Sequence, residues 1–289
     1  MIETEVEGGE RPKAKAVTVI LGAGFWRMSF KWATGFLLVS TLGVLLLSVN
    51  ATQLTESGTA HRVLRQTVAS LTEIDSLLER NTAQMVSAGG ENAQTAASRL
   101  AGFPIDIPVS DDEAAQLSTP EFRSLVLDRS ADRLYVEGFA AFREGGSQGA
   151  TDVQLLSPPG AVRYTAGMLT VDNHDIIQAV MLVLAVVAAL LTLALVLLGR
   201  GYGRLASVGL AVLLASLPLL LLSVALRFVL RLASEQESDY MTAQLYGLGR
   251  DVAWLPIRNG IIFTCLGALF LTMGLAFSLL SGKQEPSPR

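Results

Sequence analysis

The chain has very few of the residues from which metal and redox sites are built, with one cysteine and two histidines among 289 residues. The single cysteine, Cys265, excludes a disulfide within the chain, and so few ligands exclude the Cys/His spacings of zinc sites. Serine-nucleophile, Walker and kinase motifs are also absent. We therefore predict a protein that is not an enzyme and that has no cofactor.

Charge is scarce as well, because Asp, Glu, Lys and Arg make up 17% of the residues, against about one quarter in soluble domains. These residues and histidine are missing from four runs of 22 to 24 residues, Trp32–Thr55, Ile176–Gly199, Leu205–Leu226 and Asn259–Gly282. About 20 helical residues cross the hydrocarbon core of a bilayer. The runs predict four transmembrane helices, and their lack of ionisable residues argues against ion-coupled transport.

The predicted fold class is membrane α-helical, with four transmembrane helices. Between the first two we expect a mainly helical extracytoplasmic domain, with a strand or two towards its end. The first helix is longer than a signal-peptide core, so we expect a retained anchor. In chain order we expect a cytoplasmic tail with an interfacial segment (1–31), helix 1 (32–55), the extracytoplasmic domain (56–172), helix 2 (173–199), a cytoplasmic turn (200–204), helix 3 (205–231), a short outer loop (232–257), helix 4 (258–282) and a cytoplasmic tail (283–289).

Lysine is confined to one predicted side of the membrane, at Lys13, Lys15, Lys31 and Lys283. Positive residues near short loops stay cytoplasmic, so we predict a multi-pass protein of the cell membrane with both termini in the cytoplasm. The segment from Leu54 to Asn173 has no lysine and holds 16 acidic residues against nine arginines. It therefore lacks the basic footprint of a nucleic-acid partner.

The predicted extracytoplasmic domain contains several helix signals. Apolar residues at helical spacing predict an amphipathic helix over Thr59–Val86, and a weaker alanine-rich helix follows at Asn92–Leu100. Ser110 with Glu113, and Ser118 with Glu121, have capping-box spacing. We expect the helix after Ser118 to continue to Gly145-Gly146, and the alternating stretch FPIDIPV to be extended.

The stretch LLGRGYGRLAS places Gly199, Gly201 and Gly203 between arginines. A phosphate-binding glycine loop needs a preceding strand, whereas here a long apolar helix precedes it. We interpret the stretch as a tight turn between helices 2 and 3, with glycine permitting positive φ at a helix end.

Two polar clusters are weak candidate sites. Asp172, His174 and Asp175 are metal-ligand types, but Asp172 or Asn173 would equally serve as a helix cap. Arg227 and Arg231 lie one turn apart where helix 3 leaves the membrane. They would either extend to the interface, with Glu235 as an ion-pair partner, or together bind an anionic ligand or lipid headgroup.

Helix 4 carries a stripe of small residues with a period of seven. Small side chains let helix backbones approach closely, so we predict a packing face that contacts either another helix of this chain or a second copy. Its residues are Gly260, Thr264, Gly267, Gly274, Ser278 and Ser281.

Three functional hypotheses follow. The first is a non-enzymatic sensor, scaffold or assembly subunit that contacts a membrane-protein partner through its extracytoplasmic domain. The second is a homo-oligomeric channel or transport subunit packed through helix 4. The third is a protein that handles anionic lipid of the bilayer through Arg227 and Arg231.

Overall fold

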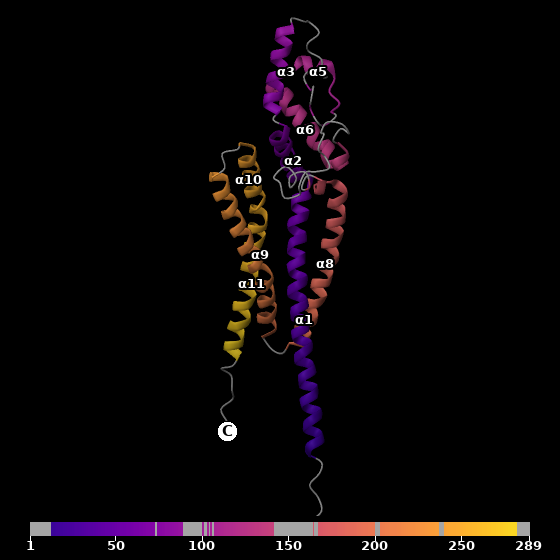
Figure 1. Ribbon diagram of the computed structural model, residues 1–289. Coiled ribbons are helices and arrows are strands. Elements are labelled where there is room, and N and C mark those ends of the chain that lie inside the picture. Colours follow the sequence, from indigo (N-terminus) through magenta and orange to yellow (C-terminus); the bar gives the residue numbers. More distant parts are fainter. Residues whose placement is uncertain are drawn as a thin grey trace, which may run out of the picture. The chain divides into compact units, whose positions relative to one another are not determined.

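The computed structural model describes residues 13–72, 74–88, 100, 103, 105, 107–141, 164, 167–199, 203–236 and 240–281. These residues are almost entirely helical and contain no β-strand. In chain order the helices are α1 (Lys13–Thr55), α2 (Ser57–Thr72), α3 (Ile74–Ala88), α5 (Asp111–Gln116), α6 (Thr119–Glu137), the 3₁₀ turn η1 (Gly138–Ala141), α8 (Val171–Leu198), α9 (Gly203–Gln236), α10 (Tyr240–Val252) and α11 (Trp254–Ser281) (Figure 1).

Four of the described stretches are long and apolar enough to cross a membrane, which confirms the number of spans predicted. They are Met28–Thr55, Val171–Leu198, Gly203–Glu235 and Tyr246–Leu280. Helix α1 continues without a break from Lys13 through the first span. Helix α9 also continues through Pro218, which membrane helices tolerate. The chain is thus a multi-pass membrane protein by length and composition.

The chain divides into two compact units. One comprises Met1–Val44, Leu184–Leu217 and Ile262–Arg289, and the other Leu45–Val183 and Pro218–Ile261. We call them the span unit and the mixed unit, because the second combines the ends of spans with the other helices.

In the span unit, α9 and α11 approach at the level of their backbones. A Cβ built on Gly209 would lie 2.4 Å from the Leu271 nitrogen and 2.7 Å from the Gly267 carbonyl oxygen. The hydroxyls of Ser216 and Thr264 lie 3.0 Å apart across the same two helices. Small residues on both helices make this close packing possible.

The core of the mixed unit joins α2, α3 and α6. The spacing that predicts an amphipathic helix is reflected in burial, since Leu64, Val68, Ile74 and Leu78 are all buried. The expected single helix is instead two, α2 and α3, with residue 73 outside the described part. Across from them α6 contributes its largest buried side chain, Phe122, to the same cluster.

Local signals set the beginnings of α5 and α6. The Glu113 backbone N–H donates to the Ser110 hydroxyl, and the Ser110 N–H donates to the Glu113 carboxylate. At α6 both the N–H and the hydroxyl of Ser118 donate to Glu121. These bonds satisfy N–H groups that a helix start leaves free.

The end of α6 differs from the prediction of a stop at Gly145-Gly146. The helix ends at Gly138, which has a φ of 59°, a left-handed conformation that glycine adopts at low cost. Gly145 and Gly146 lie outside the described residues, as does most of the predicted helix at Asn92–Leu100. In the extended stretch, Phe103, Ile105 and Ile107 are buried at alternate positions.

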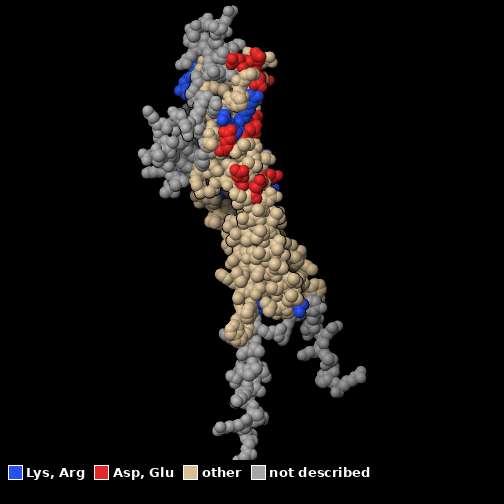
Figure 2. Space-filling model, turned by 90° about the vertical axis from the view of Figure 1, so that its right-hand side faces the viewer, with Lys and Arg blue, Asp and Glu red and all other residues tan. Residues whose placement is uncertain are grey.

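Ion pairs cross the surface between these helices. Acidic and basic side chains are interspersed on the face of the molecule that Figure 2 displays. Arg65 and Asp128 form an ion pair of 2.7 Å between α2 and α6, and the His61 Nε2 atom lies 2.7 Å from the Asp132 carboxylate. Because α6 numbers fall as α2 numbers rise, the two helices run antiparallel.

The segment predicted as a short outer loop, 232–257, is partly helical. It contains α10, a helix of 13 residues, whose Leu248 and Val252 pack against the core cluster. Two glycines, Gly247 and Gly249, weaken its helical propensity, so packing on the core rather than local preference accounts for the helix.

Candidate functional site

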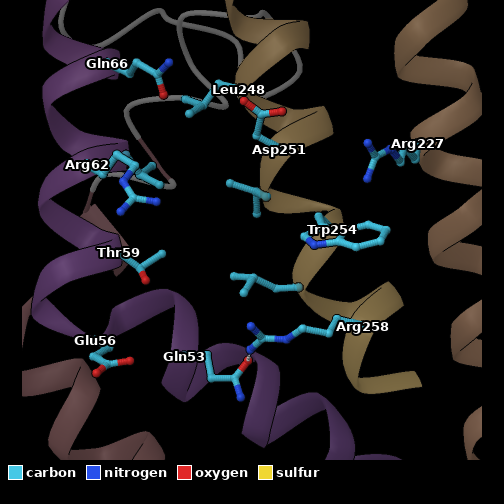
Figure 3. A pocket seen from close by; sticks show the side chains of 13 residues that line it. Gln53, Glu56, Thr59, Arg62, Gln66, Arg227, Leu248, Asp251, Trp254 and Arg258 are labelled. Atoms are coloured by element: carbon cyan, nitrogen blue, oxygen red, sulfur yellow. Dashed lines mark hydrogen bonds between the residues drawn. The ribbon is translucent and has the colours of Figure 1, made fainter. Parts of the chain in front are cut away.

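A cavity of about 800 Å³ lies in the mixed unit and is here named the α2–α10 cavity (Figure 3). Its walls are α2 on one side and α10 with the start of α11 on the other. The lining residues are Gln53, Glu56, Thr59, Arg62, Val63, Gln66, Arg227, Leu248, Asp251, Val252, Trp254, Leu255 and Arg258.

Helical periodicity aims these side chains at one space. On α2 the lining positions Thr59, Arg62, Val63 and Gln66 recur at the spacing of one helix face. The adjacent face of α2 carries the buried core residues. One helix thus supplies both an apolar core and a largely polar cavity wall.

A buried amide network fixes one end of the cavity. The Asn259 side-chain nitrogen donates to Asn50 at 2.7 Å and to Gln53 at 2.8 Å. The same Gln53 oxygen accepts from Arg258 at 3.3 Å, the bond drawn dashed in Figure 3. Asn259 is only 6% exposed, so its partners matter, because a buried amide without them is costly.

Charge in the cavity is mixed, with a surplus of guanidinium. Arg62, Arg227 and Arg258 line it together with two carboxylates, Glu56 and Asp251. In Figure 3, Arg62 and Asp251 lie on opposite walls of the cavity. The lining therefore carries one positive charge in excess at neutral pH, which favours an anionic group on a ligand.

Arg227 is the residue whose bonding is incomplete. Its guanidinium carbon lies 5.0 Å from the centroid of the Trp254 ring, a cation–π contact. Its Nη1 atom is buried and has no hydrogen-bond partner among the described residues. A buried charged donor without an acceptor costs upwards of about 1–3 kcal/mol, so this position is suited to an acceptor from a ligand.

The second predicted anion contact lies elsewhere. Arg231 donates to Glu235 at 3.0 Å and its side chain is 66% exposed. It does not line the α2–α10 cavity. The structure therefore separates the two arginines, and Arg258, rather than Arg231, lines the cavity together with Arg227.

The predicted metal candidates do not converge. His174 contacts the Thr55 hydroxyl at 3.0 Å through Nδ1, and no group of three His, Cys, Asp or Glu side chains in the described part of the chain could hold a metal ion. Nor is Asp172 or Asn173 the cap of α8. That role falls to Thr170, whose hydroxyl accepts from the Asn173 N–H.

Tyr135 contacts Thr55, the same residue that His174 contacts. Its hydroxyl donates to the Thr55 carbonyl at 3.2 Å, and its ring centroid is 4.9 Å from that of His61. Burial, with the carboxylates of Asp175 and Glu56, raises the pKa of Tyr135 above its usual value. The tyrosine therefore stays neutral and ties α6 to the end of α1.

The small residues predicted as the packing face of helix 4, which is α11 in the structure, face α9 of the same chain at several positions. Positions 260, 267 and 274 have Leu220, Leu213 and Ala206 as close neighbours, and Thr264 contacts Ser216. Ser278 is exposed, and the side chain of Ser281 lies outside the described residues. A second copy that used the same face would have to displace α9.

Sequence reasoning missed the cavity itself and two of its arginines, Arg62 and Arg258. The one available signal was the presence of amides, Asn50, Gln53 and Asn259, at the ends of otherwise apolar runs.

No protein-family model, curated protein or solved structure matches the chain.

Proposed function

We propose that this protein is a non-enzymatic membrane sensor that binds an anionic ligand in the α2–α10 cavity. The observation that carries the proposal is the buried Nη1 of Arg227, which has no hydrogen-bond partner in the part of the chain that the structure describes. A phosphate or carboxylate placed there would supply the missing acceptor, and Arg258 provides a second guanidinium in the same lining. The anionic ligand comes from the third hypothesis of the sequence analysis, and the sensing role comes from the first.

The walls of the cavity connect directly to membrane spans. Helix α2 begins at Ser57, two residues after α1 ends, and α10 ends at Val252, two residues before α11 begins. A ligand that bridges the walls would change the spacing of α2 and α10 and, with it, the ends of α1 and α11. This connection favours sensing over storage, since binding would be transmitted to two membrane helices.

The proposed location is the cell membrane, with both termini cytoplasmic and the cavity on the outer surface. The positions of the lysines support this orientation. The ligand would then be an anionic lipid headgroup of the outer leaflet or a small anion in the outer compartment. A partner protein in the same membrane would receive the signal. A channel packed through helix 4 has less support because α9 occupies that face.

Trp254 provides a reporter for binding, because it lines the cavity beneath Arg227. The full chain, with Trp26 and Trp32 replaced by phenylalanine, is titrated with glycerol phosphate, or reconstituted with phosphatidylglycerol or phosphatidylcholine. We expect a saturable change in Trp254 emission with the anionic probes. A response only to phosphatidylglycerol identifies a lipid headgroup, and a response to glycerol phosphate identifies a soluble anion.

The matched variants are Arg227→Gln and Arg231→Gln, one helical turn apart. A charge-assisted hydrogen bond contributes about 1.5–3 kcal/mol, so Arg227→Gln should weaken binding roughly tenfold to 150-fold. Arg231→Gln should leave it unchanged, since Arg231 pairs with Glu235 outside the cavity. Equal loss in both variants, or no saturable response to either anion, would refute an anion site at Arg227.

Transmission is tested separately by a distance measurement. Spin labels at Ser70 on α2 and Gly247 on α10, with Cys265 replaced by serine, report the spacing of the walls. A Cβ at Gly247 meets no atom within 4 Å, so the label is accommodated. We expect the distance to change on binding in the parent and to stay constant in Arg227→Gln. Binding without a change in distance would retain the site but refute the sensing role.

A further inference from the structure

A second cavity, independent of the proposed anion site, lies in the span unit. It has a volume of about 460 Å³ and is lined by α1, α9 and one residue of α8. We name it the α1–α9 groove. Its lining is apolar apart from Lys31 and Ser207, so a small polar ligand is excluded and a hydrocarbon ligand is favoured.

The length of the groove matches one leaflet of a bilayer. Its α1 wall extends from Met28 to Val39, 11 positions apart on one helix face. At 1.5 Å per residue this is about 16 Å, and half of a hydrocarbon core of about 30 Å is about 15 Å. An acyl chain that enters at the interface would therefore lie along the whole wall.

A missing side chain leaves the groove open. Gly35 lies in the middle of the α1 wall, and a Cβ built there meets no atom within 4 Å. A helix is too large to enter the groove, since 16 Å of helix with a diameter of about 10 Å would fill roughly 1,300 Å³. The volume thus fits a single chain of methylenes, whereas a second copy of this protein could only cover the opening.

Charge is confined to one end of the groove. Lys31 is the one charged residue among those that line it, and it lies near the first residue of the span Met28–Thr55. Ser207 lies near the start of the span Gly203–Glu235. Because consecutive spans alternate in direction, the first and third run parallel, which places both polar residues towards the same interface.

We propose that the α1–α9 groove holds one acyl chain of an anionic phospholipid whose phosphate pairs with Lys31. The neighbouring Trp32, 70% exposed, lies where tryptophan rings favour the headgroup level. The polar end thus selects the headgroup and the Gly35 opening admits the chain. This lipid would be an integral part of the span unit, bound whether or not the α2–α10 cavity is filled.

The test uses Trp32 as the reporter, in the full chain with Trp26 and Trp254 replaced by phenylalanine. The protein is reconstituted in nanodiscs of brominated phosphatidylcholine, which quenches Trp32, and unbrominated phosphatidylglycerol is added in steps. If binding is selective, the fraction of Trp32 fluorescence that is recovered exceeds the mole fraction of phosphatidylglycerol in the nanodisc. We expect a preference of about fivefold, the factor for one lysine at an anionic lipid surface.

Three variants separate the contributions of charge and space. Lys31→Gln should abolish the preference for phosphatidylglycerol. Gly35→Leu should fill the groove and also abolish it, whereas Gly43→Leu should preserve it. Gly43 is the matched control because its Cβ position on α1 is likewise open but does not line the groove.

Any of three results would overturn the proposal. Fluorescence recovery that follows the mole fraction of lipid in the parent would show that the groove does not select. Equal behaviour of Gly35→Leu and Gly43→Leu would show that the groove is not the site. Protection of Trp32 from brominated lipid in a chemically crosslinked dimer would show that a second copy covers this face instead.

Discussion

Replacing Gly209 by alanine is expected to separate α9 from α11 and to destabilise the protein. The added Cβ would lie 2.4 Å from the Leu271 nitrogen and 2.9 Å from its Cα. Both are backbone atoms, which cannot rotate away as the end of a flexible side chain can. The two helices must therefore move apart along the contact that also includes Gly267.

The size of the effect follows from two opposing terms. Overpacking costs about 1–3 kcal/mol, and a contact with rigid backbone on both helices places Gly209→Ala near the upper end. Alanine gains about 1 kcal/mol over glycine in helix propensity. The expected net loss is about 2 kcal/mol, which is roughly a 30-fold change in the unfolding equilibrium.

The assay is equilibrium unfolding in mixed micelles with increasing dodecyl sulfate, followed by circular dichroism. Gly43→Ala is the control, because its new methyl group meets no atom within 4 Å and it keeps the propensity gain. We expect Gly43→Ala to be more stable than Gly209→Ala by about 3 kcal/mol. Equal stability of the two variants would refute the close approach of α9 and α11.

Two further predictions concern the mixed unit. Arg129, with the Ser110 N–H, lowers the pKa of Glu113 from 4.5 to about 2, so this carboxylate stabilises the fold above about pH 4.5 and its contribution is lost as the pH falls towards 2. The thermal unfolding temperature of the parent should therefore approach that of Glu113→Gln as the pH falls through this window. A difference that stays constant with pH would contradict the assignment. Asn259→Leu removes both donors to Asn50 and Gln53 and should cost about 1–2 kcal/mol, measured by the same detergent titration; full stability would show that the amides find other partners.

Local and periodic signals in the sequence predicted much of the fold. The spans depend on length and lack of charge alone, because a bilayer needs about 20 apolar residues. The start of α5 depends on Ser110 and Glu113, three residues apart, and the buried stripe of α2 and α3 on helical spacing. Such features are predictable since the interacting groups are neighbours in the chain.

Other features were hidden because their cause lies far along the chain. Helix α10 forms where a loop was predicted, since Leu248 and Val252 find a core built mainly by residues more than a hundred positions earlier. The break of α6 at Gly138 rather than at Gly145-Gly146 also needed the backbone conformation. Composition alone could not distinguish these glycines.

The candidate site likewise combines features set by neighbouring residues with features set by distant parts of the chain. The sequence by itself determined that Arg227 and Arg231 lie at the end of a span, one turn apart, because helical spacing is a local property. Only the tertiary structure decided that Arg227 joins Trp254 at the α2–α10 cavity while Arg231 pairs with Glu235. Equivalent residues on one helix acquire different roles when a second helix packs against one of them, and that packing is set by contacts between distant parts of the chain.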